Sequence, residues 1–155
     1  MIEVIINFLH LLATSVWIGG AVYTHLILLP SLKMIDPQQG GKLLSVIAKR
    51  FSITAWSCII ILIITGLLKT PGDMLFDTSS DIGLALTFKH ILILAVVIVG
   101  LVIALVVVPK MRQSTPKPGE VPSADFIKYQ HQLHNLATTN LILGVLIVLL
   151  ASMLW

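Results

Sequence analysis

Five histidines and one lysine stand out because they lie within or beside long apolar runs of a 155-residue chain. Ionisable side chains are costly in hydrocarbon, so those that remain there are candidates for function. Neutral imidazole is a common ligand of haem iron and of copper. The chemistry these residues can support is therefore metal or haem ligation inside a membrane. The residues are His10, His25, Lys89, His90, His131 and His134.

The apolar runs that carry these residues are long enough to cross a bilayer. Charged side chains make up only 11% of the chain, against about a quarter in a typical soluble domain. A spanning helix needs about 20 apolar residues, and unalternating runs do not suit a barrel of strands. The sequence therefore predicts an all-α, integral membrane, antiparallel four-helix bundle, as a single transmembrane domain over residues 1–155 without an internal repeat. The predicted spans are about 4–29, 43–69, 82–108 and 126–155, with Pro30 and Pro109 ending the first and third.

Charges in the connections between the spans predict the orientation. The first and third connections are basic, and the second is acidic. Because Lys and Arg are enriched in cytoplasmic loops, we expect both basic connections in the cytoplasm and both termini outside it, in the inner (plasma) membrane. This topology accounts for the excess of ten Lys and Arg over seven Asp and Glu, and we expect no nucleic-acid partner.

Two pairs of histidines are predicted to lie at matching depths. With a rise of about 1.5 Å per residue, His10 and His90 both lie roughly 10 Å to the outer side of their span centres. His25 and His134 both lie toward the cytoplasmic side. Haem iron takes ligands on opposite faces of its ring, so imidazoles at one depth on different helices suit axial ligation. The depths predict one or two haem b groups, held by His10 with His90 and by His25 with His134.

Other residues are candidates for supporting roles. Trp17 lies on the His10 face of the first span at about 100° per residue. Arg50, near the cytoplasmic edge, is a candidate partner for haem propionates. His131 shares one helical face with His134 and is either a further metal ligand or an interfacial side chain. Each histidine also has a simpler interpretation, an interhelical hydrogen bond that only joins helices.

Short motifs in the chain resemble the copper-resistance D family and its relatives. They are Leu9-His10-Leu11-Leu12-Ala13, Trp17-Ile18-Gly19-Gly20, Thr65-Gly66, and Ile82-Gly83 leading through Leu86 to Lys89. A histidine in the first helix and a lysine in the third also resemble the membrane protoporphyrinogen oxidase of haem synthesis, which binds haem. That second resemblance implies functional roles for His10 and Lys89, with Lys89 catalytic, and leaves His90 as an extra residue.

The leading hypothesis is a membrane b-type haem protein of the copper-resistance D type that transfers electrons. This hypothesis places the protein in the lipid bilayer, where it would exchange electrons with a membrane redox protein or a quinone. A homo-oligomer is also compatible with the sequence. The alternatives are copper or other metal-ion transport through the same histidines, a protoporphyrinogen oxidase-like oxidoreductase, and a small assembly subunit. All five methionines lie at span ends or in loops, which does not favour a thioether relay for Cu(I).

Overall fold

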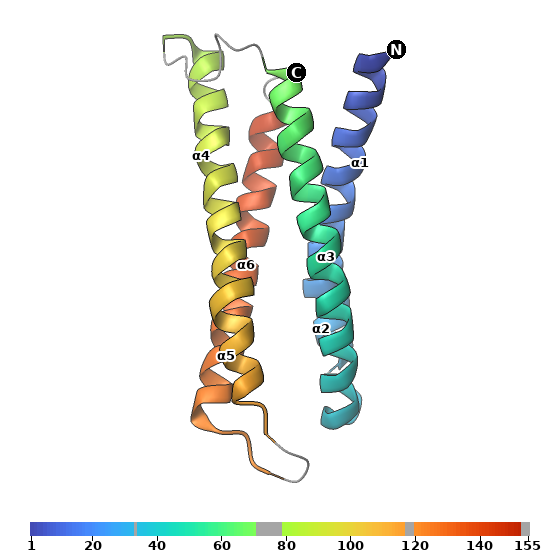
Figure 1. Cartoon of the computed structure of the whole chain (residues 1–155), viewed down its shortest axis with the longest axis vertical. Coiled ribbons are helices and arrows are strands. Elements are labelled where there is room, and N and C mark those ends of the chain that lie inside the picture. The colour runs from blue at the N-terminus through green and yellow to red at the C-terminus, as the bar shows by residue number, and fades with distance from the viewer. Residues whose placement is uncertain (33, 71–78, 117–119, 153–155) are drawn as a thin grey trace. The chain divides into compact units, whose positions relative to one another are not determined.

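The computed structural model describes residues 1–32, 34–70, 79–116 and 120–152, and these residues form helices joined by turns and irregular segments (Figure 1). Four helical stretches are long and apolar enough to cross a membrane. They are Ile2–Leu32, Leu43–Lys69, Asp81–Gln113 and Ala124–Ser152. The predicted all-α membrane class with four long helices is confirmed. The predicted end of the fourth span at Trp155 lies outside the described residues.

The chain divides into two compact units, Met1–Leu75 and Phe76–Trp155. Each unit is a pair of antiparallel arms (Figure 1). In the first unit, one arm consists of α1 (Ile2–Tyr23), η1 (Thr24–Leu28) and α2 (Leu29–Leu32), and the other is α3 (Pro37–Lys69). In the second unit, one arm consists of α4 (Asp81–Val102), η3 (Ile103–Val107) and α5 (Val108–Gln113), and the other is α6 (Ala124–Ser152).

Polar side chains cap the starts of three helices. The Asp36 carboxylate accepts a hydrogen bond from the Gln39 backbone N–H at 3.1 Å, next to the first turn of α3. The Ser80 hydroxyl accepts one from the Gly83 N–H at the start of α4. Ser123 does the same for Phe126 at the start of α6. Such caps satisfy backbone donors that have no partner within the helix, so they explain where the helices begin.

The prediction that Pro30 and Pro109 end their helices is wrong. Each proline follows a five-residue π-helical segment, η1 or η3, and the arm continues beyond it. The backbone N–H of Leu29 donates to the Thr24 carbonyl, and that of Val108 donates to the Ile103 carbonyl. Each of these hydrogen bonds spans five residues, as in a π-helix. Proline normally breaks an α-helix because it lacks an N–H and its ring clashes with the carbonyl four residues earlier. The wider π turn accommodates the ring, so the helical arm passes the proline.

The two units share a plan that the sequence pattern alone did not reveal. In both, a long helix leads into a π segment, a proline follows two residues after that segment, and a second long helix returns. The buried residues also correspond, since Leu28 and Val107 each end a π segment. The expectation of no internal repeat is therefore corrected, because the order of helical segments is the same in both units.

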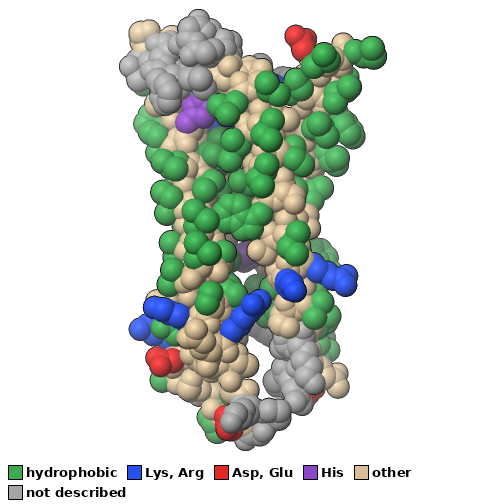
Figure 2. All heavy atoms as spheres, in the orientation of Figure 1, with side chains coloured by type: hydrophobic (Ala, Val, Ile, Leu, Met, Phe, Trp, Pro, Cys, Tyr) green, Lys and Arg blue, Asp and Glu red, His purple; other side chains and the backbone are tan. Residues whose placement is uncertain are grey.

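Most large apolar side chains point away from the interior of their own unit. Apolar side chains cover the middle of the helices in Figure 2, and Lys and Arg gather toward one end. Few residues are buried among the described ones; Ala13, Trp17, Cys58, Ile59 and Val96 are examples. A soluble protein rarely exposes so large an apolar surface. A bilayer removes that cost, because lipid tails are as apolar as these side chains.

Adjacent glycines on α1 provide a matched test of how closely α1 packs on α3. A Cβ atom built on Gly20 would lie 2.6 Å from Cε2 of Phe51, whereas one on Gly19 meets nothing within 4 Å. We expect Gly20→Leu to lower the free energy of unfolding by about 1–3 kcal/mol, because overpacking forces side chains from their rotamers. Gly19→Leu should change it little. Thermal unfolding of both variants in one detergent checks this, and equal melting temperatures would contradict the packing.

Candidate functional site

His10 is joined to α3 by a hydrogen bond across the first unit. Its Nδ1 lies 2.7 Å from Oγ1 of Thr65, 55 residues away in the sequence. Thr65 is only 4% exposed and lies near the end of α3. Because the helices run antiparallel, a residue near the start of α1 and one near the end of α3 lie at the same level. This contact makes His10 part of a defined interhelical site.

The hydrogen bonds of Thr65 favour one tautomer of His10. The Thr65 hydroxyl donates to the Ile61 carbonyl at 2.6 Å, so its one hydrogen is used within α3. Its oxygen can then only accept from His10, which places the imidazole proton on Nδ1. In a neutral ring with the proton on Nδ1, the lone pair is on Nε2. Nε2 is therefore the ring nitrogen of His10 with the lone pair that a metal ligand needs.

Small and buried residues surround this part of α1. Ala13 and Trp17 follow His10 by three and seven residues, so they share its side of the helix, and both are buried. A Cβ atom on Gly66 would lie 3.8 Å from Cε1 of His10, so the ring edge lies over the glycine next to Thr65. An alanine Cβ at residue 66 would make ordinary van der Waals contact with the imidazole. The ring is thus oriented by a hydrogen bond and lies beside Gly66.

His25 has a different environment, within η1. Its Nδ1 lies 3.0 Å from the Ala21 carbonyl, which can only accept, so this imidazole also carries its proton on Nδ1. In a regular α-helix, at about 100° per residue, His25 would be displaced from His10 by only about 60° around the axis. The π segment changes the residues per turn, so that angle does not apply beyond Tyr23.

Lys89 and His90 are half-buried neighbours on α4, and Nδ1 of His90 is buried. The shared plan of the units bears on their roles. His10 is the third residue of Phe8-Leu9-His10-Leu11-Leu12, and His90 is the third of Phe88-Lys89-His90-Ile91-Leu92. The two histidines match within these short motifs. Alignment of the units on their π segments and prolines instead places Lys89 at the position of His10, since each lies 20 residues before its proline, and His90 at the position of Leu11.

The remaining candidates are exposed. His131 and His134 lie exposed on α6, and the His134 carbonyl accepts a hydrogen bond from Thr138 at 2.9 Å. Arg50 is exposed on α3. Within the described ranges, no three His, Cys, Asp or Glu side chains are grouped to hold one metal ion. The predicted pairs are His10 with His90 and His25 with His134. Each pair takes one histidine from each unit, and both pairs remain predictions.

Sequence analysis did not identify Thr65 as the partner of His10. A signal was present, because Thr65 is a hydroxyl residue in the apolar run from 58 to 68. It lies about 13 Å to the outer side of the middle of the predicted span 43–69, on the same side of the membrane as His10 and a few ångströms farther out than the level predicted for it. A polar residue at the depth of an intramembrane histidine on the next helix is a reasonable candidate partner.

Comparison with known proteins places most of the chain in one family. Residues 45–154 match the family model described as Copper resistance protein D. The matched segment includes Thr65, Gly66, Lys89 and His90, whereas the motif around His10 precedes it. No curated protein and no solved structure matches the chain. The resemblance drawn from the short motifs is confirmed at the family level.

Proposed function

Because the chain belongs to the copper resistance protein D family, we propose that it is a multi-pass membrane redox protein that binds haem b through His10. The observation that carries this proposal is the hydrogen bond from His10 to Thr65. Histidines that bind metals commonly donate their other ring N–H to a protein acceptor, which sets the tautomer and makes the ligand more basic. The same hydrogen bond also joins α1 to α3, so direct detection of the bound group separates a ligand from a packing residue.

The residues present suit an axial haem ligand. His10 offers an imidazole whose Nδ1 is hydrogen-bonded to Thr65, and Gly66 lies beside its ring. A bound haem would supply one-electron chemistry at its iron. The protein residues would hold the ligand in orientation, exclude water with their apolar side chains and so influence the reduction potential.

Further assignments belong to the same proposal. His90 is the second outer ligand that we favour over Lys89, because imidazole is a common ligand of haem iron and the residues around His90 resemble those around His10. His25 and His134 are the ligands of a second, inner haem, and Arg50 pairs with a propionate. We propose a single four-span domain that exchanges electrons with a quinone or a membrane redox partner.

Copper handling is the second candidate function, and the family match favours it. Imidazole suits copper as well as haem iron. In this case His10 would hold a copper ion through the same Nε2 atom. The hydrogen bond between His10 and Thr65 is equally compatible with haem binding and with copper binding. The bound metal must therefore be identified directly.

The experiment that separates these functions is an absorption spectrum combined with metal analysis of the purified full-length chain. The protein is expressed with an adequate supply of haem precursor and copper. A Soret band with sharpened bands on reduction, and iron bound in proportion, supports the haem proposal. Retained copper without a Soret band replaces it with copper handling. A protein that retains neither group contradicts both functions.

The proposed orientation places the connection after α3 outside and that after α5 in the cytoplasm. In a Cys58→Ala background, we expect Ser79→Cys to react with a membrane-impermeant maleimide in intact cells. Val121→Cys, at a site 88% exposed, should react only after permeabilisation. The opposite pattern would reverse the orientation, and reaction of both in intact cells would contradict the arrangement of spans.

A further inference from the structure

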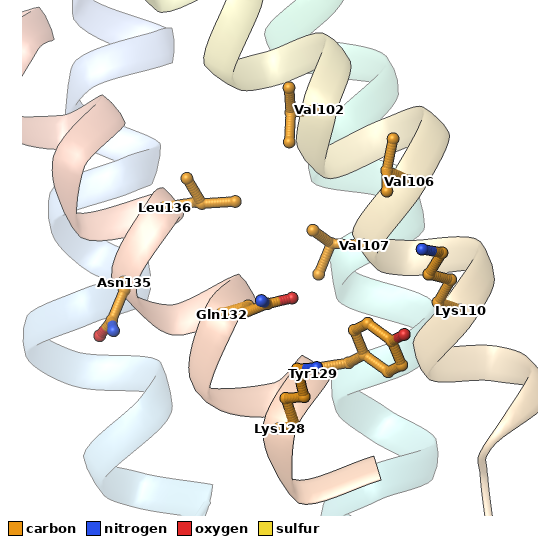
Figure 3. Close-up of a pocket in the computed structure, with 9 residues that line it drawn as sticks. All are labelled: Val102, Val106, Val107, Lys110, Lys128, Tyr129, Gln132, Asn135 and Leu136. Carbon is orange, nitrogen blue, oxygen red and sulfur yellow. The ribbon is translucent and has the colours of Figure 1, made fainter. Parts of the chain in front are cut away.

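A pocket of about 450 Å³ lies in the second unit, between α6 and the arm made by α4, η3 and α5 (Figure 3). One end of it is mainly apolar, although Asn135, next to Leu136 in the sequence, also lines the pocket. Val102 and Val106 line this end from the arm, and Leu136 lines it from α6. Val107, only 3% exposed, closes the wall between the helices. This end suits a hydrocarbon chain.

The other end of the pocket is basic and polar. Lys110 of α5 and Lys128 of α6 line it together with Tyr129 and Gln132. Nζ of Lys110 lies 5.9 Å from the centre of the Tyr129 ring, within the range of a cation–π contact. Figure 3 shows the two lysines and the tyrosine at one end of the pocket and the valines toward the other. The polar groups can bind an anion through charge and through the donors of Tyr129 and Gln132.

The position of the pocket along the helices matches the edge of a membrane. It is lined by the last turns of the stretch Asp81–Gln113 and the first turns of Ala124–Ser152, two stretches that can each cross a bilayer. Its apolar end therefore lies toward the middle of the membrane and its lysines toward the headgroup level. Phospholipids have the same order of groups, with a phosphate at the interface and acyl chains below it.

We propose that this pocket binds an anionic phospholipid, with its phosphate at Lys110 and Lys128 and an acyl chain against Val102, Val106 and Leu136. Basic pockets between membrane helices on the cytoplasmic side are known to hold anionic headgroups. The two lysines favour a lipid with net negative charge over a zwitterionic one. The proposal is independent of haem or copper binding, because it uses none of the histidines.

Native mass spectrometry of the full-length chain tests the proposal, with dioleoyl-phosphatidylglycerol and dioleoyl-phosphatidylcholine as probes. We expect phosphatidylglycerol to bind at least about tenfold more tightly. Lys110→Gln and Lys128→Gln should each weaken it by about fivefold, and together by roughly tenfold to thirtyfold, because each lysine near an anionic surface contributes an effect of this size. Lys49→Gln, which removes an exposed lysine of α3 outside the pocket, is the matched control and should change it by less than about twofold.

Four results would overturn the proposal, the last of them in a competition experiment. The first is equal binding of the two lipids, and the second is unchanged phosphatidylglycerol binding by the double variant. The third is a loss in Lys49→Gln as large as that in the pocket variants. Inorganic phosphate is added as a competitor, and we expect it not to displace the lipid at equal concentration. Displacement under that condition would show a site for free phosphate and also contradict lipid binding.

Discussion

Replacing His10 with alanine is expected to cause the largest loss of function, at least a tenfold fall in bound haem per chain. The imidazole supplies a direct bond to the metal in the proposed site, and alanine offers no ligand. The side chain is also the one that Thr65 orients, through the 2.7 Å hydrogen bond from Nδ1. The measurement is Soret absorbance per mole of protein, with iron determined in the same samples.

Two variants keep this prediction testable if His10→Ala folds poorly. His10→Met retains a side chain able to bind haem iron, and replacement of an axial histidine by methionine raises the reduction potential. We therefore expect retained haem with a higher midpoint potential. His131→Ala, at an exposed position of α6, serves as the control and should keep the wild-type spectrum. Full haem content in a folded His10→Ala protein would contradict ligation by His10.

Replacing Thr65 with valine is expected to weaken metal binding by about 10–100-fold although Thr65 itself binds no metal. Valine has nearly the same shape as threonine but cannot accept the hydrogen bond from Nδ1 of His10. The imidazole then loses the interaction that sets its proton and its orientation. The free energy of unfolding should also fall by about 1–3 kcal/mol, since a buried hydrogen bond is removed.

The spectrum distinguishes a positioning role for Thr65 from a purely structural one. Thr65→Ser keeps the hydroxyl and should restore both haem content and midpoint potential, even if it packs less well. Thr14→Val is the matched control, because Thr14 also bonds to a carbonyl one turn back, that of His10, but reaches no other helix. A Thr65→Val protein with unchanged haem affinity and potential would show that Thr65 serves packing alone.

The membrane location and the number of helices were predictable from the sequence. Both depend on the length and composition of apolar runs, which are local properties of the chain. The helix starts were also close to their predicted positions, because Ser80 and Ser123 cap α4 and α6 through residues only three positions away. Local signals of this kind need no knowledge of the other helices.

Pro30 and Pro109 show where a local rule was insufficient. The rule assumes an α-helical turn before the proline, and the structure contains π segments there instead. The π segments revealed that the two units share one plan. On that plan His10 and Lys89 lie at equivalent positions, each 20 residues before its proline, which periodicity along a single helix could not show.

The sequence alone determined that this protein is a membrane protein with histidines at depths where metal ligation is plausible chemistry. It could not determine which atom of His10 is available to a metal. That depends on Thr65, which lies 55 residues away and meets His10 only because α1 and α3 pack antiparallel. The preferred tautomer follows because the Thr65 hydroxyl already donates its hydrogen bond to the Ile61 carbonyl. Tertiary structure decided it, because a hydrogen-bond direction is a property of the assembled helices.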